Sequence, residues 1–119
     1  MKQKLLTHDD RRYADEAKAL DANPDLYVGG ATFGWLKTAL DSMEKIHQPG
    51  YLNDITTPLL VILAGDDRVV NSAASRVLLS GYDNINVITI TESRHEIYRE
   101  ADQYRDQLWQ KIDGFLAVE

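Results

Sequence analysis

The segment TPLLVILAG, residues 57–65, constrains the fold more than any other part of this chain. Its apolar residues form a continuous run and do not alternate with polar ones. Such a run is typical of a strand covered on both faces, as in parallel sheets. Parallel strands need a crossover connection, which is usually a helix. We therefore expect an α/β arrangement around this segment.

The residues that follow predict the rest of such a unit. NSAASRVLLSGY, residues 71–82, indicates a short helix with Asn71 or Ser72 as N-cap. INVITIT, residues 85–91, is rich in β-branched residues and predicts a second strand. From Glu100 onward apolar residues keep helical spacing: Tyr104, Leu108, Ile112, Phe115 and Leu116. Residues 55–119 should thus form strand, helix, strand, helix, with parallel strands and a right-handed crossover.

Residues 1–54 predict only helices and loops. One helix is expected over residues 8–22, ending before the Pro24 region. A second should follow GGAT, with Thr32 as its N-cap. Its apolar face would contain Phe33, Leu36, Leu40, Met43 and His47. Packing of a small helical segment is the simplest interpretation of this face.

Composition excludes several classes of function. The formal net charge of −6 argues against a nucleic-acid binder, which needs a basic face, and gives no electrostatic reason to bind an anionic membrane. The chain contains no cysteine, so disulfides, thiolate metal sites and a cysteine nucleophile are excluded. No apolar run approaches the roughly 18 residues of a membrane span, and no signal peptide is expected.

Two loops after the predicted strands contain an acid and a base. Asp67 lies in AGDDRVV, and His95 lies in SRHEIYRE. The carboxyl ends of parallel strands are where α/β proteins place their chemistry. A carboxylate on one imidazole nitrogen fixes the tautomer while the other nitrogen accepts a proton from a hydroxyl. The order Asp before His, with a serine earlier still, is that of the α/β-hydrolase triad.

Four stretches, which represent the acid loop, the histidine loop and the cap segment, make the resemblance specific. ITTPLLVILAGDDRVVNSAASRVL resembles the acid loop of α/β-hydrolases, and ESRHEIYRE resembles their histidine loop. LTHDDRRY and NPDLYVGGATFGWLKTAL are similar to the cap segment of bacterial lysophospholipases and monoacylglycerol lipases, which are serine aminopeptidase S33-like. The resemblance implies a C-terminal portion of an α/β-hydrolase fold, with a helical cap segment at 1–54 and the βαβα part of the core at 55–119.

The same resemblance implies roles and a substrate. Asp67 would be the triad acid, with Asp66 as the competing position, and His95 would be the base. The parent protein would hydrolyse a lysophospholipid or monoacylglycerol without a metal or organic cofactor. Trp35 would be core packing of the cap or, alternatively, part of an acyl-chain wall. The expected location is the cytoplasm, or the inner membrane surface.

The family nucleophile, in G-x-S-x-G, is absent from this sequence. Ser93 is near His95 but lies on the same loop, without a following helix N-terminus to support an oxyanion. We therefore expect a fragment of a longer hydrolase, inactive alone, or a degenerate stand-alone product of one. A non-catalytic interaction module is an alternative. A receiver-like phosphoacceptor domain is another, although the further Asp and Lys that it needs are missing.

Other polar residues predict supporting roles. Glu96 and Glu100 would be exposed, or would hold the histidine loop through backbone hydrogen bonds. His8 and His47 have no evident partners, and His47 lies on the core-facing stripe of its helix. Two strands leave unpaired edges, so the isolated chain should form a homo-oligomer or a strand-swapped dimer, or aggregate.

Overall fold

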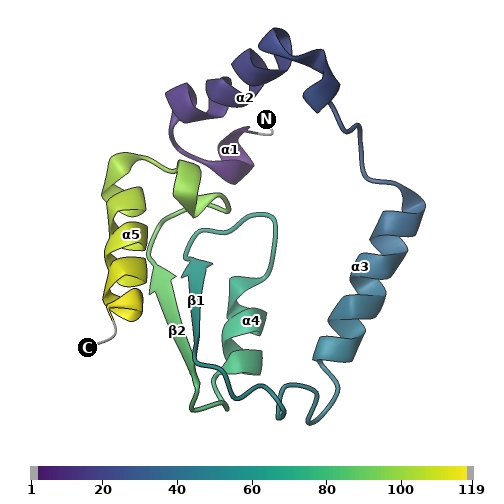
Figure 1. Cartoon of the computed structure of the whole chain (residues 1–119), viewed down its shortest axis with the longest axis vertical. Helices are drawn as coiled ribbons and strands as arrows, with labels where there is room; N and C mark the ends of the chain where they lie inside the picture. The colour runs from purple at the N-terminus through teal and green to yellow at the C-terminus, as the bar shows by residue number, and fades with distance from the viewer. Residues whose placement is uncertain (1–2, 118–119) are drawn as a thin grey trace.

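The computed structural model of the chain describes residues 3–117 (Figure 1). Its α-helices and strands, in order, are α1 (Gln3–Leu6), α2 (Asp10–Ala22), α3 (Phe33–Ile46), β1 (Leu59–Ala64), α4 (Ser72–Leu79), β2 (Ile85–Ile90) and α5 (Asp102–Leu116). The remaining elements of the described residues are two short 3-10 helices, η1 (Pro24–Leu26) and η2 (Ile97–Arg99). Apart from the short helix α1, every α-helix and strand lies where the sequence predicts it.

Side-chain caps confirm the predicted N-termini of α3 and α4, and a third cap occurs at α2. The Thr32 side chain accepts a hydrogen bond from the Trp35 amide at the start of α3. Asn71, one of the two candidates for α4, accepts from the Ala74 amide. Asp9 does the same for α2, where it accepts from the Arg12 amide. Each cap satisfies an amide that lacks a partner within the first helical turn.

Strands β1 and β2 form a parallel sheet, as predicted. The register runs from Leu59 opposite Ile85 to Ala64 opposite Ile90, and α4 lies in the connection between the strands. The carboxyl ends of both strands therefore reach the same edge (Figure 1). This edge positions the two loops that contain Asp67 and His95.

Helix α5 covers one face of this sheet and forms the core with it. Strand side chains alternate between the faces, and one alternating set contacts α5. The cluster consists of Ala64, Ile90, Ile97, Tyr104 and Leu108. Of the expected apolar face of the C-terminal helix, Tyr104 and Leu108 are buried and Ile112 packs against the cluster, whereas Leu116 is 66% exposed. Because Ala64 and Ile90 end their strands, this core directly supports the loops that follow.

Helix α4 lies against the opposite face. Arg76 of α4 is hydrogen-bonded to the hydroxyl of Thr89, whose neighbour in the strand, Ile90, belongs to the α5-facing core. Residues adjacent in a strand point to opposite faces. The two helices therefore sandwich the two strands, in the order that Figure 1 shows.

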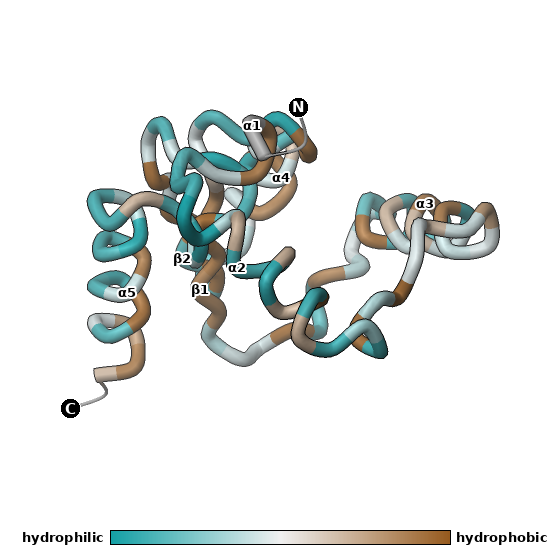
Figure 2. Tube along the Cα trace, turned by 90° about the horizontal axis from the view of Figure 1, so that it is seen from above, coloured by the Kyte–Doolittle hydropathy of each residue, from teal (hydrophilic) through white to brown (hydrophobic). Residues whose placement is uncertain are grey.

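Helix α3 stands away from the rest of the chain (Figures 1 and 2). None of its residues is buried, so the expectation that its apolar stripe packs within a small cap is wrong for this chain. His47, expected on a core-facing stripe, is exposed and donates from Nδ1 to the Met43 carbonyl, 2.7 Å away. The apolar residues exposed on α3 are Phe33, Trp35, Leu36, Leu40, Met43 and Ile46.

The molecule is more open than a folded monomer of its size. Its accessible surface is 8878 Å², whereas a compact protein of 13.5 kDa would expose about 6,500 Å². Its radius of gyration is 16.7 Å, against about 13.5 Å for a compact chain of this length. A two-strand sheet and an unpacked helix account for this excess. Among residues 3–117, no helix has the length and apolar character needed to cross a membrane.

Candidate active site

The loops after β1 and β2 are joined directly by backbone hydrogen bonds. The Gly65 amide donates to the Ile90 carbonyl at 2.9 Å, and the Asp66 amide donates to the Ser93 carbonyl at 2.9 Å. A Cβ placed on Gly65 would lie 2.9 Å from backbone atoms of the second loop. Glycine is therefore required here for close approach, since any side chain would push the loops apart.

This approach brings Asp67 and His95 together. Oδ2 of Asp67 lies 3.0 Å from Nδ1 of His95, which is within hydrogen-bonding distance. The Asp67 side chain is 5% exposed, whereas that of His95 is 34% exposed. The acid is thus enclosed and the imidazole reaches the surface, so a reacting group can approach His95 but not Asp67.

Backbone amides hold the other oxygen of the Asp67 carboxylate. Oδ1 accepts from the Val69 amide at 2.8 Å and from the Val70 amide at 3.0 Å. Burial raises the pKa of Asp67, but the hydrogen bonds from Val70, His95 and Val69 outweigh it and leave the pKa below its usual value. Asp67 is therefore ionised at neutral pH.

An ionised carboxylate only accepts hydrogen bonds, so Nδ1 of His95 must carry the proton in this pair. In neutral imidazole the second nitrogen, Nε2, is then an acceptor. Within residues 3–117, no hydrogen bond to Nε2 of His95 is formed. The pair therefore presents a base whose tautomer is fixed by a buried carboxylate, which is the arrangement that activates a hydroxyl nucleophile.

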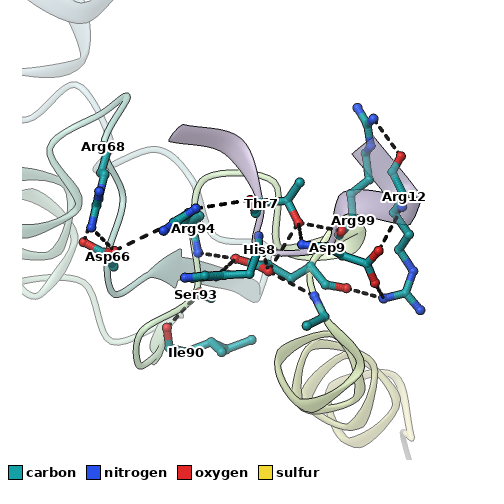
Figure 3. Close-up of polar contacts among 12 residues, drawn as sticks. Thr7, His8, Asp9, Arg12, Asp66, Arg68, Ile90, Ser93, Arg94 and Arg99 are labelled. Atoms are coloured by element: carbon teal, nitrogen blue, oxygen red, sulfur yellow. Dashed lines mark hydrogen bonds and ion pairs between the residues drawn. The ribbon is translucent and has the colours of Figure 1, made fainter. Parts of the chain in front are cut away.

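Asp66 does not join this pair. Its carboxylate binds Arg68 at 2.9 Å and lies 4.0 Å from Nε of Arg94 (Figure 3). The hydrogen bond from Arg68 is the main reason that the pKa of Asp66 is lowered. Of the two candidate acids, the geometry therefore pairs Asp67 and not Asp66 with the imidazole.

Ser93 is fully buried, and its hydroxyl donates to the Ile90 carbonyl at 2.8 Å (Figure 3). A hydroxyl whose proton is bound inside the turn, without exposure, does not present an attacking oxygen. Ser93 instead closes the turn between β2 and His95, which includes Glu92 with a positive φ of 63°.

Glu100 and His8 form a second histidine–carboxylate pair, which sequence reasoning missed. Nδ1 of His8 lies 2.7 Å from Oε1 of Glu100. Glu100 is 0% exposed, so of the two alternatives for this residue the exposed one is wrong and the loop-holding one is confirmed. No local pattern signals a pair formed by residues 92 positions apart.

Trp35 does not contact the Asp67–His95 pair. It is 62% exposed and lines a shallow hollow of about 410 Å³ at the start of α3. Val28, Ala31 and Thr32 line the same hollow. An apolar wall is present here, but no described element covers it.

The described residues contain no group of three or more histidine, aspartate or glutamate side chains placed to hold a metal ion. His8 and His95 each contact a single carboxylate, Glu100 and Asp67 respectively. The structure therefore has two separate histidine–carboxylate pairs, His8 with Glu100 and His95 with Asp67.

Comparison with known proteins adds a family to this geometry. Residues 1–102 match the family described as serine aminopeptidase, S33. The chain is similar to the "Probable lysophospholipase L2" of Haemophilus influenzae, with 26% identity over 97 residues. That alignment covers 82% of this chain and 30% of the relative, so the chain spans less than a third of the length of this curated protein. No solved structure matches the chain significantly.

Proposed function

Because this chain belongs to the serine aminopeptidase S33 family and has part of its α/β-hydrolase fold, we propose that it is a portion of a longer serine ester hydrolase. Residues 1–54 are the helical cap segment and residues 55–119 the C-terminal part of the core. Asp67 is the triad acid and His95 the triad base. The contact of 3.0 Å between them, at the carboxyl ends of two parallel strands, is the observation that carries this proposal.

In the reaction, Nε2 of His95 removes the proton of a serine hydroxyl as the serine oxygen attacks the ester carbonyl. The imidazolium is stabilised by the ionised Asp67 and then protonates the leaving alcohol. The acyl-serine is next attacked by water, whose proton His95 accepts and returns to the serine. In this scheme the Asp67 carboxylate must be fixed and unprotonated. The hydrogen bonds that the Val69 and Val70 amides donate to it favour both conditions.

The nucleophile belongs to a part of the hydrolase outside this sequence. No serine here lies in G-x-S-x-G, and the buried Ser93 hydroxyl is bound to Ile90. An oxyanion hole is likewise needed, and removing such donors alone costs about 100- to 1,000-fold in rate. The chain by itself is therefore inactive towards esters.

The relative and the exposed face of α3 support a proposal for the substrate class. The similar protein of Haemophilus influenzae is named a probable lysophospholipase, and we propose a lysophospholipid, or a monoacylglycerol, as the substrate here. The exposed apolar residues of α3, Trp35 among them, would shelter the acyl chain. The hydrolase would act in the cytoplasm or at the inner membrane surface.

Ester hydrolysis tests this proposal in two proteins. The first is the chain as given, and the second is the chain expressed with the coding sequence that precedes it in its genome. Both are assayed with a short p-nitrophenyl ester and with a lysophospholipid, beside His95→Ala and Asp67→Asn variants. Fluorophosphonate labelling with mass spectrometry identifies any activated serine.

We expect no hydrolysis and no labelled serine in the chain alone, and activity in the longer protein that both substitutions remove. Activity of the chain alone that His95→Ala abolishes would contradict the missing nucleophile. A longer protein that binds no fluorophosphonate and hydrolyses neither ester would instead reject the hydrolase assignment and leave the interaction module as the alternative.

A further inference from the structure

The backbone on both sides of His95 is held by other parts of the chain. The Arg94 amide donates to Oε1 of Glu100 at 2.8 Å. The Glu96 amide donates to the carbonyl of Leu6 at 2.9 Å. Leu6 precedes α2 and is remote in sequence from the histidine loop. The position of His95 therefore depends on a buried carboxylate and on a segment near the N-terminus.

Glu100 connects these two supports. Its carboxylate accepts four N–H groups: the His8 amide at 2.9 Å, Nδ1 of His8 at 2.7 Å, the Arg94 amide at 2.8 Å and the Ala101 amide at 3.0 Å. Burial raises the pKa of Glu100, but the hydrogen bonds from His8, Arg94 and Ala101 prevail and lower it. A buried carboxylate is tolerated only when it is so paired.

The segment Leu6–His8 is fixed to the same place by further bonds. Thr7 is fully buried, and its hydroxyl donates to the Arg99 carbonyl at 2.8 Å (Figure 3). Nη1 of Arg94 donates to the Thr7 carbonyl at 3.3 Å. The His8 ring lies against the Tyr104 ring of α5, with centroids 5.6 Å apart. The segment is thus bound to the histidine loop on one side and to the core on the other.

We propose that Glu100 and His8 are positioning residues for His95, and that the segment Leu6–His8 is a structural part of the histidine loop. The proposal rests on the proposed function for its catalytic meaning. Glu100 holds the backbone before His95, and His8 holds Glu100 through both its backbone amide and Nδ1. Neither residue is bonded to the His95 imidazole among the described contacts, so both act through the loop.

Two substitutions separate this role from general stability. Glu100→Gln puts an amide NH₂ where one oxygen accepted N–H groups, so half of the acceptors are lost while the volume is kept. His8→Leu removes the Nδ1 donor together with the ring contact to Tyr104. His8→Asn also lacks that ring but restores a donor near the same place, so the two variants isolate the hydrogen bond. Glu44→Gln is the matched control, because it makes the same chemical change at a residue that is exposed on the surface of α3.

The first measurement is NMR of the ¹⁵N-histidine-labelled chain, which has three histidines. In the unaltered chain the Nδ1–H proton of His95 should resonate far downfield, because Asp67 accepts it. We expect Glu100→Gln and His8→Leu to broaden or remove this signal, and His8→Asn to restore it. Amide exchange at residues 94–96 should rise at least about tenfold more than exchange in α4.

An unchanged His95 signal in both Glu100→Gln and His8→Leu would overturn the proposal. So would an equal rise of exchange in α4, because that result means general destabilisation. If Glu100→Gln does not fold, the pair His8→Leu and His8→Asn decides alone, since His8 is at the surface and its loss leaves Glu100 with its backbone donors.

The second measurement concerns the longer protein. There we expect Glu100→Gln and His8→Leu to lower kcat by about 10- to 100-fold with KM unchanged, as for misplaced catalytic groups. A change confined to KM would contradict positioning. If the unaltered longer protein lacks esterase activity, the proposed function fails, and the NMR result still decides whether Glu100 and His8 position His95.

Discussion

Gly65 and Glu92 belong to different loops, yet a Cβ on Gly65 would lie 2.9 Å from the backbone nitrogen of Glu92. The same Cβ would lie 2.9 Å from the Ile90 carbonyl oxygen. All of these neighbours are backbone atoms at the end of β2, so no side chain can move aside. The distance between Asp67 and His95 therefore depends on the absence of a side chain at residue 65.

Gly65→Ala should separate the two loops. Overpacking against backbone lowers the free energy of unfolding by about 1–3 kcal/mol, which urea unfolding measures. Gly114→Ala is the control, since a Cβ there meets nothing within 4 Å and should stabilise α5 by about 0.5–1 kcal/mol. Equal stability of the Gly65→Ala and unaltered proteins would show that the loops are not in close contact.

Acid should destabilise the chain through Glu100 and Asp67. The pKa of each is lowered in the folded state, so their contributions are complete above the unfolded-state pKa values of about 4 and are lost as pH falls through the lower folded values. We expect the free energy of unfolding to decline below about pH 5. It should decline less steeply in Glu100→Gln than in Glu44→Gln, and identical slopes would contradict the role of Glu100.

Removal of the α4 cap and removal of the α3 cap should affect stability differently. Asn71→Ala removes the cap of α4, which packs on the sheet, and should lower global stability by about 1 kcal/mol. Thr32→Ala removes an equivalent cap from α3, but α3 has no buried residue. Loss of the Thr32 cap should therefore raise amide exchange within α3 only. A global loss from Thr32→Ala would mean that α3 packs against the core in solution.

Association of the isolated chain is expected from its exposed apolar surface. In sedimentation velocity, the sedimentation coefficient should rise with protein concentration. The reason is that the apolar face of α3 and the outer edge of β1 can pair with other copies of the chain. Replacing Leu40 and Met43 with Gln should weaken the part that α3 contributes. Replacing exposed Lys37 and Asp41 of the same helix with Ala is the control. A monomer at all concentrations would contradict this expectation.

The position and type of nearly every element could be predicted from local sequence. The apolar run at residues 57–65 predicts its strand because a strand covered on both faces has such a run, and the run at 85–91 predicts its strand because β-branched residues favour strands. Thr32 and Asn71 mark helix starts because their side chains accept the first free amides. The relation between Asp67 and His95 also follows from sequence, since parallel strands end at one edge.

Tertiary structure alone decided the partners of Glu100, the distance between the loops and the isolation of α3. The pair of Glu100 and His8 joins residues 92 positions apart, and such contacts leave no period or motif in the sequence. The apolar stripe of α3 predicts a buried face, but burial requires another surface to cover it, and residues 3–117 supply none. Local pattern determines which groups seek burial or hydrogen bonds, whereas only the folded chain determines which groups are near enough to provide them.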